Sequence, residues 1–101
     1  MDINKLMQQA QAMQKQIEKT SEQLSDMEFT GSASNGLVEV TVNGDNHVLS
    51  VHIDKSIIDP EDQEMIEDLV MIAVNDAIAK ADQKKKESFG SMASALGIPT
   101  R

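Results

Sequence analysis

The chain contains no cysteine, tryptophan or tyrosine, and phenylalanine occurs only twice in its 101 residues. The lack of cysteine excludes a disulfide framework and a thiolate site for catalysis or metal binding. With so few aromatic side chains, the hydrophobic core must be built from aliphatic residues and methionine. A monomer with such a core would be marginally stable, because small chains bury a smaller share of their surface than large ones.

Long apolar runs are also missing. No run approaches the roughly 18 residues that a membrane span requires. The N-terminal segment is polar and rich in glutamine, which is not typical of a secretory signal peptide. These features predict a soluble, cytoplasmic protein without a membrane partner.

Basic residues are scarce: nine of them face 17 acidic residues, for a net charge of −8. The charge is unevenly distributed. Residues 59–79 contain seven acidic side chains and no basic one, whereas residues 80–101 have a net charge of +3 and residues 1–25 are neutral. The global charge disfavours a polyanionic partner. The two ends of the chain are neutral to basic, however, so they could still bind one.

The N-terminal quarter of the chain carries an apolar stripe with steps of three and four residues. This spacing is typical of a helix that packs one narrow seam against another helix. A helix over Asp2–Asp26 would be about 37 Å long at ~1.5 Å per residue, whereas a compact domain of this size has a radius of gyration of about 13 Å. We therefore expect the helix to project and its seam to be covered by a second copy of the chain. The seam residues are Ile3, Leu6, Ala10, Met13, Ile17, Thr20, Leu24 and Met27.

The next segment has the two-residue period of β-strands. Glu28 to Ala33 is a short strand candidate, and Leu37 to Val42 and Val48 to Ile53 both alternate apolar and polar residues. Turn residues separate the three segments, including Asn35-Gly36 and Asn43-Gly44. The pattern predicts a three-stranded antiparallel meander, in which Leu49, Val51 and Ile53 of the third strand point inward.

A second helix is predicted to begin at Asp59-Pro60, where Asp59 can cap the helix and Pro60 suits its first position. Met71, Ile72 and Val74 widen its apolar face, which predicts burial on more than one side. The helix becomes polar from Lys80 and continues to about Glu87 or beyond, and Gly90, Gly97 and Pro99 break a flexible tail over about residues 90–101. The predicted fold is a single α+β domain over residues 1–101, with a helix, a three-stranded antiparallel sheet and a helix. Residues that share the apolar face are Met65, Ile66, Leu69, Val70, Ala73, Ala77, Ile78 and Ala81.

Patterns for catalysis or metal binding are weak. The two histidines, His47 and His52, have no further ligands at a suitable spacing, and solvent-facing positions on a strand explain them better. No nucleophile elbow and no phosphate-binding loop occurs. We therefore expect neither an enzyme nor a site for a metal, a cofactor or a small-molecule substrate.

Lysines at both ends of the chain suggest a different kind of site. Lys15 and Lys19 are four residues apart and share one face of the first helix. The run Lys84-Lys85-Lys86 is, on its pattern alone, better explained as a solvated helix end that also favours the negative pole of the helix dipole. The pattern alone leaves nucleic-acid contact as one alternative for these two basic surfaces.

The sequence resembles the YbaB/EbfC family of bacterial nucleoid-associated proteins over nearly its whole length. The resemblance rests on the Met-Gln-rich opening at Met7-Gln8 and Met13-Gln14, and on the segment Gly36-Leu37-Val38-Glu39-Val40-Thr41-Val42-Asn43-Gly44. It also rests on residues 65–70, on Ala73-Val74-Asn75-Asp76-Ala77, on Lys80-Ala81 and on the ending Leu96-Gly97-Ile98-Pro99.

The resemblance implies a homodimer with paired helical arms that bind double-stranded DNA with little sequence preference. On this chain the arms would be residues 2–26 and about 80–94, with the acidic patch at residues 59–68 away from the phosphates. The implied DNA-binding residues are Lys5, Lys15, Lys19, Lys80, Lys84, Lys85 and Lys86. An alternative is a coiled-coil adaptor whose arms clasp a protein helix without physiological DNA binding.

Overall fold

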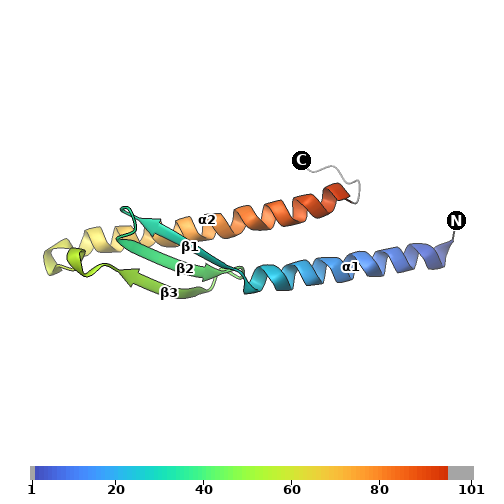
Figure 1. Ribbon diagram of the computed structural model, residues 1–101, viewed down its shortest axis with the longest axis horizontal. Coiled ribbons are helices and arrows are strands. Elements are labelled where there is room, and N and C mark those ends of the chain that lie inside the picture. The colour runs from blue at the N-terminus through green and yellow to red at the C-terminus, as the bar shows by residue number, and fades with distance from the viewer. Residues whose placement is uncertain (1, 96–101) are drawn as a thin grey trace.

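The computed structural model describes residues 2–95. It contains α1 (Ile3–Asp26), β1 (Glu28–Ala33), β2 (Val38–Asn43), β3 (Val48–Ile53) and α2 (Gln63–Ala95), with two short 3-10 turns, η1 (Lys55–Ile57) and η2 (Pro60–Asp62), before α2. The molecule measures 71 × 24 × 16 Å and has a radius of gyration of 19.6 Å, against about 13 Å for a compact chain of this length. The predicted α+β class with projecting helices is confirmed (Figure 1).

The sheet is an antiparallel meander in the order β1-β2-β3, and its turns explain the chain reversals. Asn35 and Gly36 have positive φ values of 56° and 89°, which asparagine and glycine adopt at low cost. In the second turn the Asn43 side chain accepts hydrogen bonds from the backbone N–H groups of Asp45 and His47, at 2.9 and 3.0 Å. The predicted meander is confirmed, with β2 displaced by one residue from the predicted strand.

The core lies between α2 and the first two strands. A stripe of small residues on α2 faces β1 and β2, so the helix and the sheet approach closely. At Gly31 of β1 a Cβ atom would overlap the backbone of Ala73 and Ala77, which explains why only glycine fits there. The fully or nearly fully buried residues of this cluster are Ala33, Val38, Val40, Val42, Ala73, Ala77 and Ala81.

The third strand is less covered than its sequence pattern predicted. Val51 pairs with Val40 and Ile53 pairs with Val38, so both lie on the predicted sheet face. Nevertheless Leu49 is 52% exposed and Val51 is 49% exposed, because α2 packs against β1 and β2. The expected burial of Leu49 and Val51 within the chain is therefore wrong, and β3 presents an uncovered apolar face.

Two expectations for the second helix also need correction. Met71 and Ile72 were expected to be buried, but both are exposed. The break expected at Gly90 does not occur, since α2 continues through this residue to Ala95. Asp59 does act as a cap, and its side chain accepts a hydrogen bond of 2.9 Å from the backbone N–H of Glu61 at the start of η2. The remaining predicted tail, including residues 96–99 of the family resemblance, lies outside the described residues.

Side chains from α2 occupy the free edge of β1. The backbone N–H of Ser32 donates a hydrogen bond of 3.0 Å to the Asp76 carboxylate. The Lys80 ammonium donates one of 2.9 Å to the carbonyl oxygen of Thr30 and lies 3.4 Å from Asp76. Because an open strand edge is a template for pairing with another strand, this ion pair protects one side of the sheet.

Candidate nucleic-acid interface

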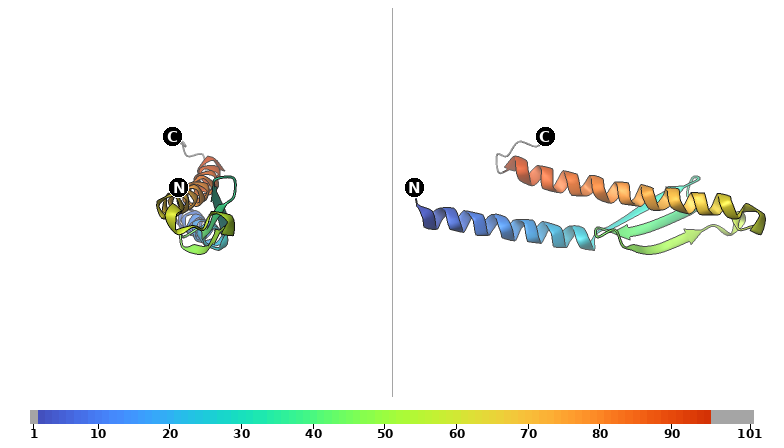
Figure 2. Two further views of the ribbon diagram at one scale, coloured as in Figure 1. Left: turned by 90° about the vertical axis from the view of Figure 1, so that its left-hand side faces the viewer. Right: turned by 180° about the vertical axis from the view of Figure 1, so that it is seen from behind.

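The first arm is α1, which extends from the sheet without lateral support. Asp2 caps the helix by accepting a hydrogen bond of 3.1 Å from the backbone N–H of Asn4. Every residue from Asp2 to Lys19 is exposed. Figure 1 and Figure 2 show that α1 and the C-terminal part of α2 extend from the same end of the sheet. The arms therefore offer the long, accessible surface that the sequence predicted.

The lysines of α1 lie on the face opposite the apolar seam. Lys15 is two residues from both Met13 and Ile17, and a step of two residues turns a helix by about 200°. Lys19 has the same relation to Ile17, and Lys5 has it to Ile3. All three lysines are exposed. The arm is thus amphipathic, with an apolar seam on one side and, on the other, a polar side on which Lys15 and Lys19 alternate with Glu18 and Glu22.

The lysine run of α2 is arranged differently. Lys84 and Lys85 are half-buried, whereas Lys86 is exposed. Consecutive helical residues point about 100° apart, so the three ammonium groups do not share one face. Lys85 lines a hollow at the base of the arms.

The structure gives Lys80 surroundings that differ from those of the other six lysines in the implied DNA-binding set. Its ammonium bonds to the Thr30 carbonyl oxygen and pairs with Asp76, and the residue lies where α2 crosses the sheet. Because this ammonium already has two partners, it is less available to a phosphate than the lysines of the arms.

Most of the predicted seam has no partner within the described chain. Ile3 is 71% exposed, and Leu6, Ala10, Met13 and Ile17 are exposed as well. Leu24, in contrast, is only 5% exposed and is the one buried residue of α1. The seam is therefore covered at Leu24 and open along its N-terminal part, and Met27 at its end is exposed as well.

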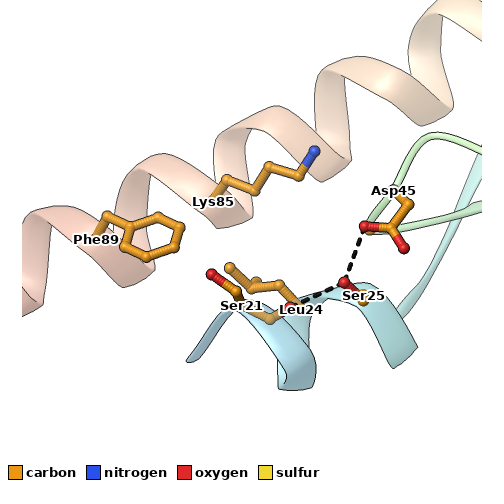
Figure 3. A pocket seen from close by; sticks show the side chains of 7 residues that line it. Ser21, Leu24, Ser25, Asp45, Lys85 and Phe89 are labelled. Atoms are coloured by element: carbon orange, nitrogen blue, oxygen red, sulfur yellow. Dashed lines mark hydrogen bonds between the residues drawn. The ribbon is translucent and has the colours of Figure 1, made fainter. Parts of the chain in front are cut away.

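The hollow at the base of the arms was not predicted from the sequence. It has a volume of about 220 Å³ and lies between the end of α1, the β2–β3 turn and α2 (Figure 3). The only feature of the sequence that could have pointed to this hollow is Phe89, which is one of two phenylalanines in the chain. The lining residues are Ser21, Leu24, Ser25, Gly44, Asp45, Lys85 and Phe89.

Two carboxylates have perturbed acidity, and both have structural explanations. The pKa of Asp76 is lowered chiefly by the hydrogen bond from the Ser32 backbone, with Lys80 adding to the effect. The pKa of Asp54 is lowered by hydrogen bonds from the side chain and the backbone of Ser56 at the start of η1. Within residues 2–95 no group of three or more acidic or histidine side chains is arranged to hold a metal ion. Neither long helix, as far as it is described, has an apolar stretch suited to crossing a bilayer.

Known nucleoid-associated proteins match this chain over nearly its whole length. The chain is 39% identical over 99 residues to a nucleoid-associated protein of Clostridium novyi, with 98% of this chain and 87% of the relative covered. It is 45% identical over 98 residues to a nucleoid-associated protein of Xylella fastidiosa, with coverages of 97% and 90%.

A crystal structure of an uncharacterized protein from Helicobacter pylori has a similar fold. Its TM-score is 0.76 at 27% identity, and the match covers 91% of this chain and 97% of that one. The sequence model of the YbaB/EbfC DNA-binding family matches residues 1–96. The helix–sheet–helix order and these matches lead to one conclusion: the chain belongs to the YbaB/EbfC DNA-binding family.

Proposed function

We propose that this protein is a homodimeric, nucleoid-associated protein of the bacterial cytoplasm, and that its helical arms bind double-stranded DNA with little sequence preference. The observation that carries the proposal is the exposed lysine pair of α1, with Lys15 and Lys19 one turn apart on a projecting helix. Lys5 and Lys84–Lys86 complete the proposed contact surface. Lys80 mainly stabilises the body through its bonds to Thr30 and Asp76. The whole chain acts as one domain in this proposal.

The chemistry of the arms favours contacts to phosphate over contacts to bases. Lysine is a compact point charge, whereas arginine provides the planar fork that reads guanine in the major groove. The chain has a single arginine, Arg101, which is its last residue. Phosphate contacts position a protein on the duplex without carrying sequence information, so we propose binding that tolerates many sequences.

The homodimer follows from apolar surface that one chain leaves uncovered. On α2, Val74 and Ile78 are each two residues from Asp76, so they lie on the opposite side of the helix from the ion pair at the β1 edge. That side is next to the uncovered face of β3, with Leu49 and Val51 exposed. We place the main dimer contact on this body face, and the α1 seam is the alternative contact.

Two charge substitutions locate the dimer contact. Val51→Asp places a charge on the body face, and Ile17→Asp places one on the arm seam; a charge buried without a partner is costly. We expect light scattering at micromolar concentration to show a dimeric wild type, a monomeric Val51→Asp variant and a dimeric Ile17→Asp variant. A monomeric wild type contradicts the homodimer, and the reverse pattern of variants moves the contact to the arm seam. Circular dichroism checks that both variants are folded.

A salt titration of DNA affinity tests the DNA-binding surface. Neutralising each phosphate contributes about −0.9 to the slope of log affinity against log salt concentration. The Lys15→Ala, Lys19→Ala double variant should weaken binding to all sequences alike and flatten that slope. Lys55→Ala is the control, because it removes one lysine charge from η1 in the body and should leave the slope unchanged.

A second variant tests the α2 arm. Replacing Lys84, Lys85 and Lys86 with alanine should also flatten the slope, and circular dichroism shows whether the helix end has frayed. If the wild type binds DNA and no lysine variant changes its affinity, DNA contacts other residues and the named surface is wrong.

The alternative function is a protein-interaction adaptor, and the open apolar seam of α1 favours it. In that case the wild type would fail to bind DNA even at low salt, where phosphate contacts are strongest. We propose a binding function without a catalytic role.

A further inference from the structure

The position of α1 depends on a small joint at its C-terminal end. Leu24 is the only buried residue of the helix, and Met27 alone separates α1 from β1. In the β2–β3 turn, Gly44 lies directly against the Leu24 carbonyl group, so that a Cβ atom at this position would overlap it. The last turn of α1 therefore holds the arm in place. The 18 residues from Asp2 to Lys19 are all exposed and give it no further support.

Two contacts complete the joint on the other sides of Leu24. Phe89 of α2 points toward Leu24 across the hollow at the base of the arms (Figure 3). The Ser25 hydroxyl lies 2.9 Å from an Asp45 carboxylate oxygen and 2.9 Å from the Ser21 carbonyl oxygen. The end of α1 is thus enclosed by an aromatic ring from α2 and by polar contacts from the β2–β3 turn.

The length of α1 amplifies any change at this joint. From Leu24 to Ile3 the helix extends about 30 Å at ~1.5 Å per residue, so a rotation of about 10° at the joint moves its tip by about 5 Å. On duplex DNA the phosphates of one strand follow the axis at about 3.4 Å intervals. A rotation of about 10° therefore shifts Lys5, near the tip, by more than one phosphate spacing, whereas Lys15 and Lys19, which are closer to the joint, shift by about 2 and about 1 Å.

We propose that Phe89, which faces Leu24 across the hollow, is a positioning residue that sets the spacing between α1 and the outer part of α2 and so controls DNA affinity. This inference rests on the proposed DNA-binding function. Phe89 carries no charge and is 36% exposed, so its effect on affinity is exerted through the position of the α1 lysines. The Ser25–Asp45 contact restrains the same joint from the side of the turn.

The spacing can be measured directly because the chain has no cysteine of its own. Spin labels on Gln9→Cys and Ser91→Cys report the distance between the two arms, since both positions are exposed and lie on different arms. Labelled protein is mixed with excess unlabelled protein, so that distances within one chain dominate in a dimer. DNA affinity is measured on the same variants without labels.

Phe89→Ala is expected to broaden the distance distribution and to raise the Kd for DNA about tenfold, equivalent to about 1.4 kcal/mol. Phe89→Leu keeps an apolar side chain at the joint and should restore both values. Met7→Ala is the control, because it removes a large exposed side chain from α1 far from the joint and should change neither value.

Each other outcome overturns the inference. An unchanged distance with weaker binding would make Phe89 a direct DNA contact or a purely stabilising residue. A changed distance with unchanged affinity would show that spacing does not control binding. Failure of the wild type to bind DNA would refute the proposed function and the control of affinity, whereas the distance measurement would still report on the joint itself.

A second, milder variant guards against a folding defect in Phe89→Ala. Ser25→Ala removes the hydroxyl that bonds to Asp45 and should shift the same distance in the same direction by a smaller amount. Ser50→Ala removes an exposed hydroxyl from β3 and should have no effect on the distance. Equal distances in Ser25→Ala, Phe89→Ala and the wild type would show that the joint does not set the spacing.

Discussion

At the scale of single residues, Asp76 and Lys80 do more than form a helical ion pair. Both are exposed to solvent in part, and such pairs contribute little stability by themselves. Their importance lies in the backbone groups of Thr30 and Ser32, which they satisfy at the edge of β1. Lys80 is therefore better described as part of the body than as part of the DNA-binding surface.

The lowered pKa of Asp76 gives a prediction about pH. In the folded state the Ser32 backbone N–H and Lys80 favour the ionised carboxylate, whereas an unfolded aspartate titrates near ~3.9. The stabilisation is present above that value and is lost as the pH falls through the lower pKa of the folded state. Urea unfolding should therefore show that Asp76→Asn is less stable than the wild type at neutral pH and that the difference shrinks in acid.

The control for this prediction is Asp68→Asn, which changes an exposed carboxylate on the same helix. It should not reproduce the loss of stability at neutral pH. Similar behaviour of the two variants would show that the bond to Ser32 is not responsible for the effect.

At the scale of elements, the sequence predicted correctly which face of a strand is apolar, but not which strands the helix α2 would cover. The alternation of β3 identified the correct face for Val51, but it could not show that α2 would cover only the neighbouring strands. Gly90 was expected to end α2, yet glycine costs only about 1 kcal/mol in a helix relative to alanine. The helix-forming residues around it outweigh that cost, and α2 continues to Ala95.

A pair of glycine substitutions tests this description of the elements. Gly31→Ala should destabilise the protein by about 1–3 kcal/mol or more, because the new methyl group overlaps the α2 backbone. Gly90→Ala meets no atom within 4 Å and should stabilise the helix by up to about 1 kcal/mol. Urea unfolding measures both changes, and a stabilising Gly31→Ala would mean that β1 and α2 are packed less closely than described.

At the scale of the whole molecule, the long axis separates opposite charges. The acidic residues of η2 and the first turns of α2 lie at one end, whereas the arms extend from the other (Figure 1). Glu64 and Lys84 are separated by about 30 Å along α2 at ~1.5 Å per residue. The Debye length is about 8 Å at physiological salt but about 30 Å at 0.01 M, so this separation weakens the repulsion expected from the net charge alone.

The salt dependence of an acidic-end variant follows from that geometry. Replacing Glu61, Glu64 and Glu67 with glutamine should change DNA affinity little at physiological salt and increase it at about 0.01 M, where screening extends over the length of α2. The measurement is a fluorescence anisotropy titration at both salt concentrations. An equal gain at both would indicate that the acidic end lies close to the bound DNA.

The joint at the base of the arms shows the limit of sequence reasoning at this scale. It brings together Leu24, Asp45 and Phe89, which are far apart in the sequence and belong to three different periodic segments. Periodicity assigns each residue to a face of its own element, but the contact depends on the angle at which α1 leaves β1. That angle is a property of the assembled molecule.

The protected edge of β1 also limits how many copies of the sheet can join. With Asp76 and Lys80 bonded to Ser32 and Thr30, a neighbouring molecule can extend the sheet only at β3. A molecule whose sheet has one open edge can pair with only one other molecule, which is a valence of one. Growth by strand pairing therefore ends with two copies. The side chains of Asp76 and Lys80 thereby act against fibrous assembly, and removing both of them would expose the second edge and raise the valence to two.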